Sequence, residues 1–172
     1  MNFEYRHLLD NNFHPDSRVW IYQSNRLFTI NEALEIEETL HEFVRQWNSH
    51  GTPVKGNGYL FFGQFIILIA DETATGVSGC STDSSVRMIR EMENKFGVNL
   101  FDRLGLAFVK NDKIEIIPMA QLNYAVENGF ISPETLYFNN VVSNKKELEQ
   151  QWIIPINNCW LKEKISFPER VS

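Results

Sequence analysis

Apolar residues between Thr29 and Gly51 recur at intervals of three and four, the period of a helix that buries one face. Thr29 and Glu32 have the spacing of a capping box, in which a hydroxyl and a carboxylate satisfy free backbone amides at the helix start. Gly51 is expected to end the helix, because glycine takes left-handed dihedral angles beyond the last turn. The apolar positions of this helix are Ala33, Ile36, Leu40, Phe43, Val44 and Trp47.

Three apolar runs with little or no helical period predict strands over 18–23, 54–62 and 65–70. Gly63 and Gln64 separate the second run from the third, as a two-residue hairpin turn would. The third run contains no polar residue. It is therefore expected to be a central strand that is covered on both faces.

A second amphipathic helix is predicted after Ser81, with Val86, Ile89, Met92 and Phe96 on its apolar face. A glycine at position 97 is expected to end it. The remaining predicted elements are strands 104–109 and 113–117 joined by a tight turn at Asn111 and Asp112, a short helix over 118–129, and a helix over 144–151.

This order of elements predicts an α+β fold. Two strand–helix–strand units in tandem match the split βαβ, ferredoxin-like sheet, here with an added strand and C-terminal helices. An α+β sheet with a different strand order is the alternative. At 172 residues the chain is expected to form a single domain over 1–172, with a core at about 18–130 and a C-terminal extension, 131–172, packed on it.

Charge and composition narrow the classes of partner. The chain carries 16 Lys and Arg against 22 Asp and Glu, a net charge of -6, and has no basic patch, so a nucleic-acid partner is not expected. The longest apolar stretch, 59–70, is too short to span a membrane. The N-terminus lacks the pattern of a secretory signal. Cys80 and Cys159 are expected to be reduced thiols in a cytoplasmic protein, although one disulfide is the alternative.

The most informative segment is the loop 71–81, which is rich in Gly, Ser and Thr and joins the predicted central strand to a helix. Small residues let a ligand approach the backbone, and a helix N-terminus offers free N–H groups. Its carboxylates favour a cation or a ligand with hydroxyl or amino groups over a phosphate, and an ordinary solvated loop is the alternative. The candidate binding residues are Asp71, Ser78, Gly79, Ser81, Asp83, Arg87 and Arg103.

Cys80 and His50 are the candidate catalytic residues. A cysteine at a helix N-terminus has a lowered thiol pKa and becomes a better nucleophile, and a histidine could serve as its base. The alternatives are a small buried thiol at Cys80 and, at His50, a cation beside a helix C-terminus. Arg103 could hold a ligand carboxylate or form an ordinary surface ion pair.

Named motifs limit the chemistry further. Residues 51–56 have the glycine spacing of a Walker A loop, but the Lys and the hydroxyl that should follow are replaced by Asn57 and Gly58. Six residues separate Cys80 from Arg87, whereas the tyrosine-phosphatase loop needs five. The cysteines and histidines show no zinc-ligand spacing, so no metal site is predicted, and the cofactor stays unknown.

Four segments together resemble an uncharacterised bacterial family of short proteins whose members are sometimes labelled "ABC transporter ATPase". The resemblance spans roughly residues 18–110 and implies a cytoplasmic location but no mechanism. The segments are Trp47-Asn-Ser-His-Gly51, Phe65-Ile-Ile-Leu-Ile-Ala-Asp-Glu72, Ser78-Gly-Cys-Ser-Thr-Asp-Ser-Ser85 and Phe101-Asp-Arg103.

The sequence favours a protein that binds a small ligand or a protein partner at the segment 71–87 and is not an enzyme. The alternative is a small enzyme or redox protein that uses Cys80 as its nucleophile. A structural subunit of an assembly is the third hypothesis. The residues name neither the ligand nor the oligomeric state.

Overall fold

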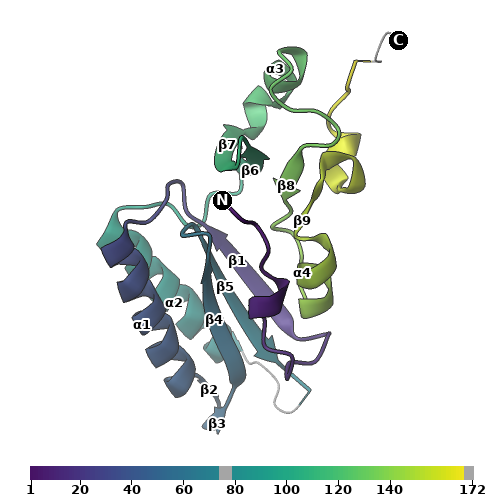
Figure 1. The fold of residues 1–172 in the computed structure, drawn as a ribbon. Helices are drawn as coiled ribbons and strands as arrows, with labels where there is room; N and C mark the ends of the chain where they lie inside the picture. Colours follow the sequence, from purple (N-terminus) through teal and green to yellow (C-terminus); the bar gives the residue numbers. More distant parts are fainter. Residues whose placement is uncertain (74–78, 169–172) are drawn as a thin grey trace. The chain divides into compact units, whose positions relative to one another are not determined.

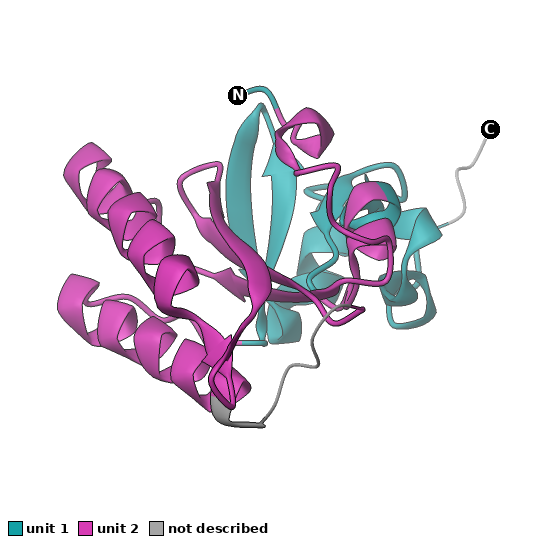
Figure 2. Ribbon diagram, turned by 90° about the horizontal axis from the view of Figure 1, so that it is seen from below, with its two compact units in different colours: residues 1–2, 103–140, 150–172 teal, residues 3–102, 141–149 magenta. Residues whose placement is uncertain are grey.

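The computed structural model describes residues 1–73 and 79–168, of which residues 79 and 80 are described by their backbone alone. The chain divides into two compact units, which Figure 2 colours separately. Unit 1 comprises residues 1–2, 103–140 and 150–172, and unit 2 comprises residues 3–102 and 141–149. The predicted extension 131–172 therefore contributes to both units, and the single domain stays a prediction.

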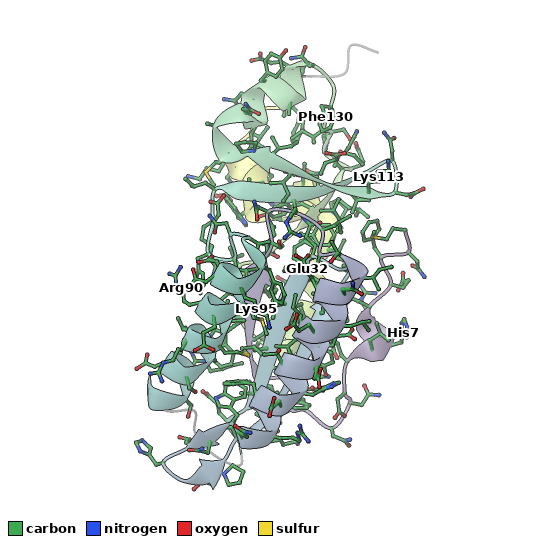
Figure 3. The ribbon with its side chains drawn as sticks, turned by 90° about the vertical axis from the view of Figure 1, so that its left-hand side faces the viewer. His7, Glu32, Arg90, Lys95, Lys113 and Phe130 are labelled. Atoms are coloured by element: carbon green, nitrogen blue, oxygen red, sulfur yellow. The ribbon has the colours of Figure 1, made fainter. Side chains whose placement is uncertain are left out.

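Unit 2 contains an antiparallel three-stranded sheet in the order β1-β5-β4, with α1 and α2 side by side on one face (Figures 1 and 3). A short hairpin, β2–β3, follows α1. The elements are β1 Arg18–Gln23, α1 Ile30–Gln46, β2 Asn48–Ser49, β3 Thr52–Pro53, β4 Lys55–Phe61, β5 Phe65–Asp71 and α2 Gly79–Phe96, preceded by a 3-10 turn at Arg6–Leu8.

The central strand β5 is buried along all seven of its residues, as its unbroken apolar run predicts. Strand side chains alternate between the two faces of a sheet. Ile66 and Leu68 point to the helices, where they join a core with Ile36 and Leu40 of α1 and Ile89 of α2. This helix-facing core is built from the residues that carry the helical period in the sequence.

The other face of the sheet is covered by the N-terminal segment and by the start of α4 (Lys145–Gln151). The Tyr5 hydroxyl donates to the backbone carbonyl of Leu148 at 2.5 Å, and the Tyr5 ring packs edge-on against Phe61. Residues 143 and 144 also extend the sheet at the outer edge of β1, where the amide of Val19 donates to the Ser143 carbonyl at 2.9 Å. Segments from both ends of unit 2 thus bury the second face of β5.

Unit 1 contains a four-stranded antiparallel sheet in the order β7-β6-β8-β9. Its core joins Phe108 and Ile117 of the sheet to Val126 of α3 and to Cys159 and Leu161 near the C-terminus. The elements are β6 Gly105–Lys110, β7 Lys113–Pro118, α3 Leu122–Glu127, β8 Leu136–Phe138 and β9 Ile153–Pro155, with 3-10 turns at Met119–Gln121, Ile156–Asn158 and Trp160–Glu163.

The fold is α+β, as predicted, but the strand order does not confirm the ferredoxin-like arrangement. The ferredoxin-like plan requires the strand after the second helix to pair beside the first strand, in the same sheet. Here that strand, β6, pairs with β7 and β8 in a second sheet.

Local predictions at α1 are confirmed at its start and wrong at its end. Thr29 and Glu32 form the predicted capping box. The helix ends at Gln46 with Trp47 in an extended conformation, so Gly51 is not its cap. Gly51 instead forms, with His50, the turn of the β2–β3 hairpin.

Gly56→Ala is expected to destabilise unit 2. A Cβ at Gly56 would lie 2.7 Å from two atoms of the Trp47 ring, closer than packed atoms allow. Overpacking of this kind costs about 1–3 kcal/mol, which exceeds the gain of less than about 1 kcal/mol from replacing a strand glycine. Urea unfolding measures the loss.

Gly58→Ala is the graded control, because its Cβ would lie 3.2 Å from Leu40, a longer distance than the 2.7 Å at Gly56, and should cost less. Equal stability of Gly56→Ala and the wild type would contradict the packing of Trp47 on β4.

Candidate functional site

The predicted site segment is described only in part. Ser78 lies outside the described residues. Gly79 and Cys80 begin α2, where only their backbone is described. The roles predicted for Ser78, Gly79 and Cys80 stay predictions.

Asp71, the last residue of β5, is 3% exposed. One of its carboxylate oxygens accepts from the Thr73 hydroxyl at 2.6 Å and from the Thr73 amide at 2.9 Å. The other oxygen lies 3.2 Å from the ammonium of Lys55. The Thr73 hydroxyl contributes most to lowering the pKa of Asp71, to about 2, and the Thr73 amide, Lys55 and the His14 backbone add to it, against the effect of burial.

Asp71 is on the sheet face that the N-terminal segment covers. Lys55 is directly opposite Asp71 in the sheet, so both side chains point the same way. The Lys55 ammonium donates to the Asn12 carbonyl at 2.6 Å. The next pair, Gly56 and Ala70, faces the helices, where Gly56 contacts Trp47. Asp71 is therefore separated by the sheet from the residues beside Trp47.

Ser81 joins the first turn of α2 to the end of α1. Its hydroxyl donates to the Asn48 carbonyl at 2.7 Å, and its carbonyl accepts from the Trp47 indole at 3.1 Å and from the Ser84 hydroxyl at 2.8 Å. Ser81 is 1% exposed. These hydrogen bonds give Ser81 a structural role, because they connect the first turn of α2 to the residues after α1. A contact between Ser81 and a ligand stays a prediction.

His50 lies at the turn of the β2–β3 hairpin, next to this tie. His50 has φ 51° and Gly51 has φ 80°, the left-handed conformation that a two-residue type I′ turn requires at both positions. Residues other than glycine seldom adopt it, although Asn, Asp and His do so more often than most. The imidazole is exposed and lies on a turn whose position is fixed by the hairpin and by Asn48.

A cavity of about 300 Å³ opens between the end of α1, the hairpin and α2, and we call it the His50 cavity. The rings of Phe43 and Trp47, 5.1 Å apart and inclined at 42°, form an aromatic wall. The cavity is lined by Phe43, Gln46, Trp47, Asn48, His50 and Ser84. His50 thus lines one cavity with Ser84 of α2, whereas Asp71 lies on the far face of the sheet.

The other predicted binding residues are not part of this cavity. Asp83 and Arg87 are exposed on α2. Arg103 is exposed and belongs to unit 1, whereas the cavity belongs to unit 2. A ligand role for each of the three stays a prediction.

Most of the residues that line the His50 cavity are not predicted as site residues from the sequence. The helical period places Phe43 and Trp47 on the buried face of the first helix, and nothing in the sequence distinguishes Ser84. The available signal was the His50–Gly51 pair, because a glycine preceded by a residue that tolerates left-handed angles is a hairpin-turn signal.

No three of the His, Cys, Asp and Glu side chains of the described residues are grouped so that they could hold a metal ion. None of the described helices is long and apolar enough to cross a membrane.

Comparisons of the chain with protein-family models, with curated proteins and with solved structures find no match. The resemblance to the bacterial family of short proteins therefore stays a prediction. Any function has to be inferred from the geometry of the site itself.

Asp71→Asn is expected to lower the free energy of unfolding at pH 7 by about 1.5–3 kcal/mol, the range for hydrogen bonds to a charged group. The pKa of Asp71 is near 3.8 when the chain is unfolded and about 2 when it is folded. Its contribution is therefore fully present above about pH 4 and is lost as the pH falls towards 2.

Urea unfolding at pH values between 2 and 7 tests this expectation. The wild type should lose stability between about pH 4 and 2 more steeply than Asp71→Asn does. Asp112→Asn is the control, because Asp112 is an exposed residue in a left-handed turn position that Asn also accepts. Parallel pH profiles for the wild type and Asp71→Asn would contradict the assignment.

Proposed function

We propose that this protein is a binding module that takes a small, uncharged, hydrogen-bonding ligand in the His50 cavity. The observation that carries the proposal is the convergence of an exposed imidazole, two side-chain amides and a hydroxyl on one aromatic wall. Pockets for small molecules combine an apolar surface with a few placed polar groups in this way. The reduced, buried thiol of Cys159 supports a cytoplasmic location for the module.

The chemistry of the lining sets the class of ligand. None of the lining side chains is charged when His50 is neutral. The aromatic wall favours a flat ring, while the amides of Gln46 and Asn48 can each donate and accept hydrogen bonds. At about 300 Å³ the cavity lies at the lower end of the usual range of ligand pockets, which suits a single heterocycle or a monosaccharide.

Two indole N–H groups offer a direct test by NMR. The Trp47 indole donates to Ser81 beside the cavity, and the Trp152 indole donates to the Asn140 side chain in unit 1. In titrations with nicotinamide, adenine and glucose, we expect at least one compound to shift the Trp47 signal in a saturable manner. The Trp152 signal should not move.

His50→Asn is the informative variant. Asn followed by glycine is the preferred type I′ turn, so the hairpin should be retained while the imidazole is lost. We expect binding of that compound to weaken by about tenfold, the effect of one lost hydrogen bond in a pocket. His41→Asn, on the exposed face of α1, is the matched control and should bind as the wild type does. No shift at Trp47 with any of the three compounds would overturn the proposal.

The second candidate is an enzyme or redox protein in which Cys80 is the nucleophile and His50 its base. One observation favours it: His50 shares the cavity with Ser84 of α2, the helix that begins at Gly79 and carries Cys80. A nucleophile and its base have to come within hydrogen-bond reach, so the reactivity of the thiol distinguishes this candidate from the binding module.

Alkylation by iodoacetamide as a function of pH measures that reactivity. In a Cys80→Ser variant we expect almost no reaction before unfolding, because Cys159 is 6% exposed and burial raises its thiol pKa. In a Cys159→Ser variant the binding module predicts an ordinary or slow thiol at Cys80. A fast reaction with a thiol pKa below about 7, slowed by His50→Asn, would favour the enzyme instead.

A further inference from the structure

The sheet of unit 1 ends on one side at β7, whose outer edge pairs with no strand among the described residues. The β6–β7 hairpin turns through Asn111 and Asp112, both at positive φ, and Lys110 is directly opposite Lys113. Such a two-residue turn makes Lys110 and Lys113 a hydrogen-bonded pair, and bonded and non-bonded pairs then alternate along the hairpin.

The alternation directs the backbone of two β7 residues away from β6. Ile114 and Ile116 are in the non-bonded pairs, opposite Val109 and Ala107. Their N–H and C=O groups therefore point outward from the sheet. No backbone hydrogen bond to these groups is found within the described part of the chain. They form a template on which an extended chain could add as a further strand.

A cavity of about 360 Å³ accompanies this edge, between β7, α3 and Phe130. Its apolar lining includes Ile117 and Ala125 of the core and Tyr124, which is 70% exposed. The polar residues that line it are Glu115, Gln121 and Asn128. No residue of β6 lines the cavity, so it lies along the outer side of β7. Alternate side chains of an added strand would point into it.

Charge at the turn end of the edge indicates the kind of strand that fits. Lys110 and Lys113 lie directly opposite each other, an arrangement that like charges destabilise. Neither forms an ion pair with a carboxylate of the described residues. The Lys110 ammonium lies 5.2 Å from the centroid of the Phe130 ring, and Figure 3 shows Lys113 and Phe130 on this part of unit 1.

We propose that the β7 edge binds an extended peptide of another protein, with acidic residues beside Lys110 and Lys113 and an apolar side chain in the cavity of β7 and α3. The open backbone groups recognise the extended conformation, the cavity selects an apolar residue, and the two ammonium groups select acidic residues. This binding surface belongs to unit 1 and is independent of the His50 cavity in unit 2.

Amide hydrogen exchange of the full-length protein tests the proposal with a pattern that only strand addition produces. The probe is the capped peptide Glu-Glu-Thr-Leu-Thr-Val-Thr. At about ten times its dissociation constant, we expect exchange at Ile114 and Ile116 to slow by about tenfold. The amides of Glu115 and Ile117 already bond to β6, so their exchange should be unchanged.

Charge reversal tests the acidic preference. The peptide Lys-Lys-Thr-Leu-Thr-Val-Thr should bind the wild type about fivefold more weakly, as expected for exposed ion pairs. Lys113→Glu places a carboxylate opposite Lys110, so the pair becomes neutral and the preference for the acidic peptide should be lost. Lys146→Glu, which makes the same charge change on α4, should preserve the preference. An unchanged preference in Lys113→Glu would overturn the acidic selectivity.

Two outcomes would overturn strand addition itself. The first is unchanged exchange at Ile114 and Ile116 with both peptides at millimolar concentration. The second is alternating protection that already appears without peptide and grows with protein concentration, because a second copy of this chain would then occupy the edge.

Discussion

The burial of β5 on both faces is the constraint on which the architecture of unit 2 depends. A strand of seven buried residues leaves no side of the sheet free for water, so each face needs its own cover. The helices α1 and α2 cover one face. An ion pair between Lys95 of α2 and Glu35 of α1 joins them. The N-terminal segment and residues 141–149 cover the other face, which explains why a segment so late in the chain belongs to unit 2.

The same constraint determines how the residues at the end of β5 are distributed. Successive side chains alternate between the faces, so Asp71 and Ala70 enter different environments. The Asp71 carboxylate accepts a hydrogen bond from the Thr73 hydroxyl and forms an ion pair with Lys55. On the helix side, Ala70 and Gly56 leave room for the Trp47 ring, whose indole then reaches Ser81. Ala70 and Asp71 are neighbours in sequence, but they contribute to two separate environments, one apolar and one charged.

How far the sequence predicts these features depends on the range of the interaction. The capping box at Thr29, the burial of β5 and the tight turn at Asn111 follow from neighbouring residues, and the structure confirms them. The pairing of β6 with β8 in a second sheet joins Phe108 to Tyr137, and hydrophobic period carries no information about which strands pair across such a distance. The β2–β3 hairpin is not predicted from the sequence, because strands of two residues are too short to show an alternation of apolar and polar residues. The His50 cavity, which combines that hairpin with α2, could not be predicted either.

Left-handed angles recur at three hairpin turns of the described residues, at positions 50–51, 62–63 and 111–112. Histidine accepts these angles more often than most residues, as asparagine and aspartate do, so the angles alone do not explain the imidazole at His50. His50 differs from the other turn residues in its surroundings, because its imidazole is exposed and lines a cavity with an aromatic wall. The proposal of a ligand at His50 therefore rests on this combination of a polar group and an apolar surface, and not on backbone strain.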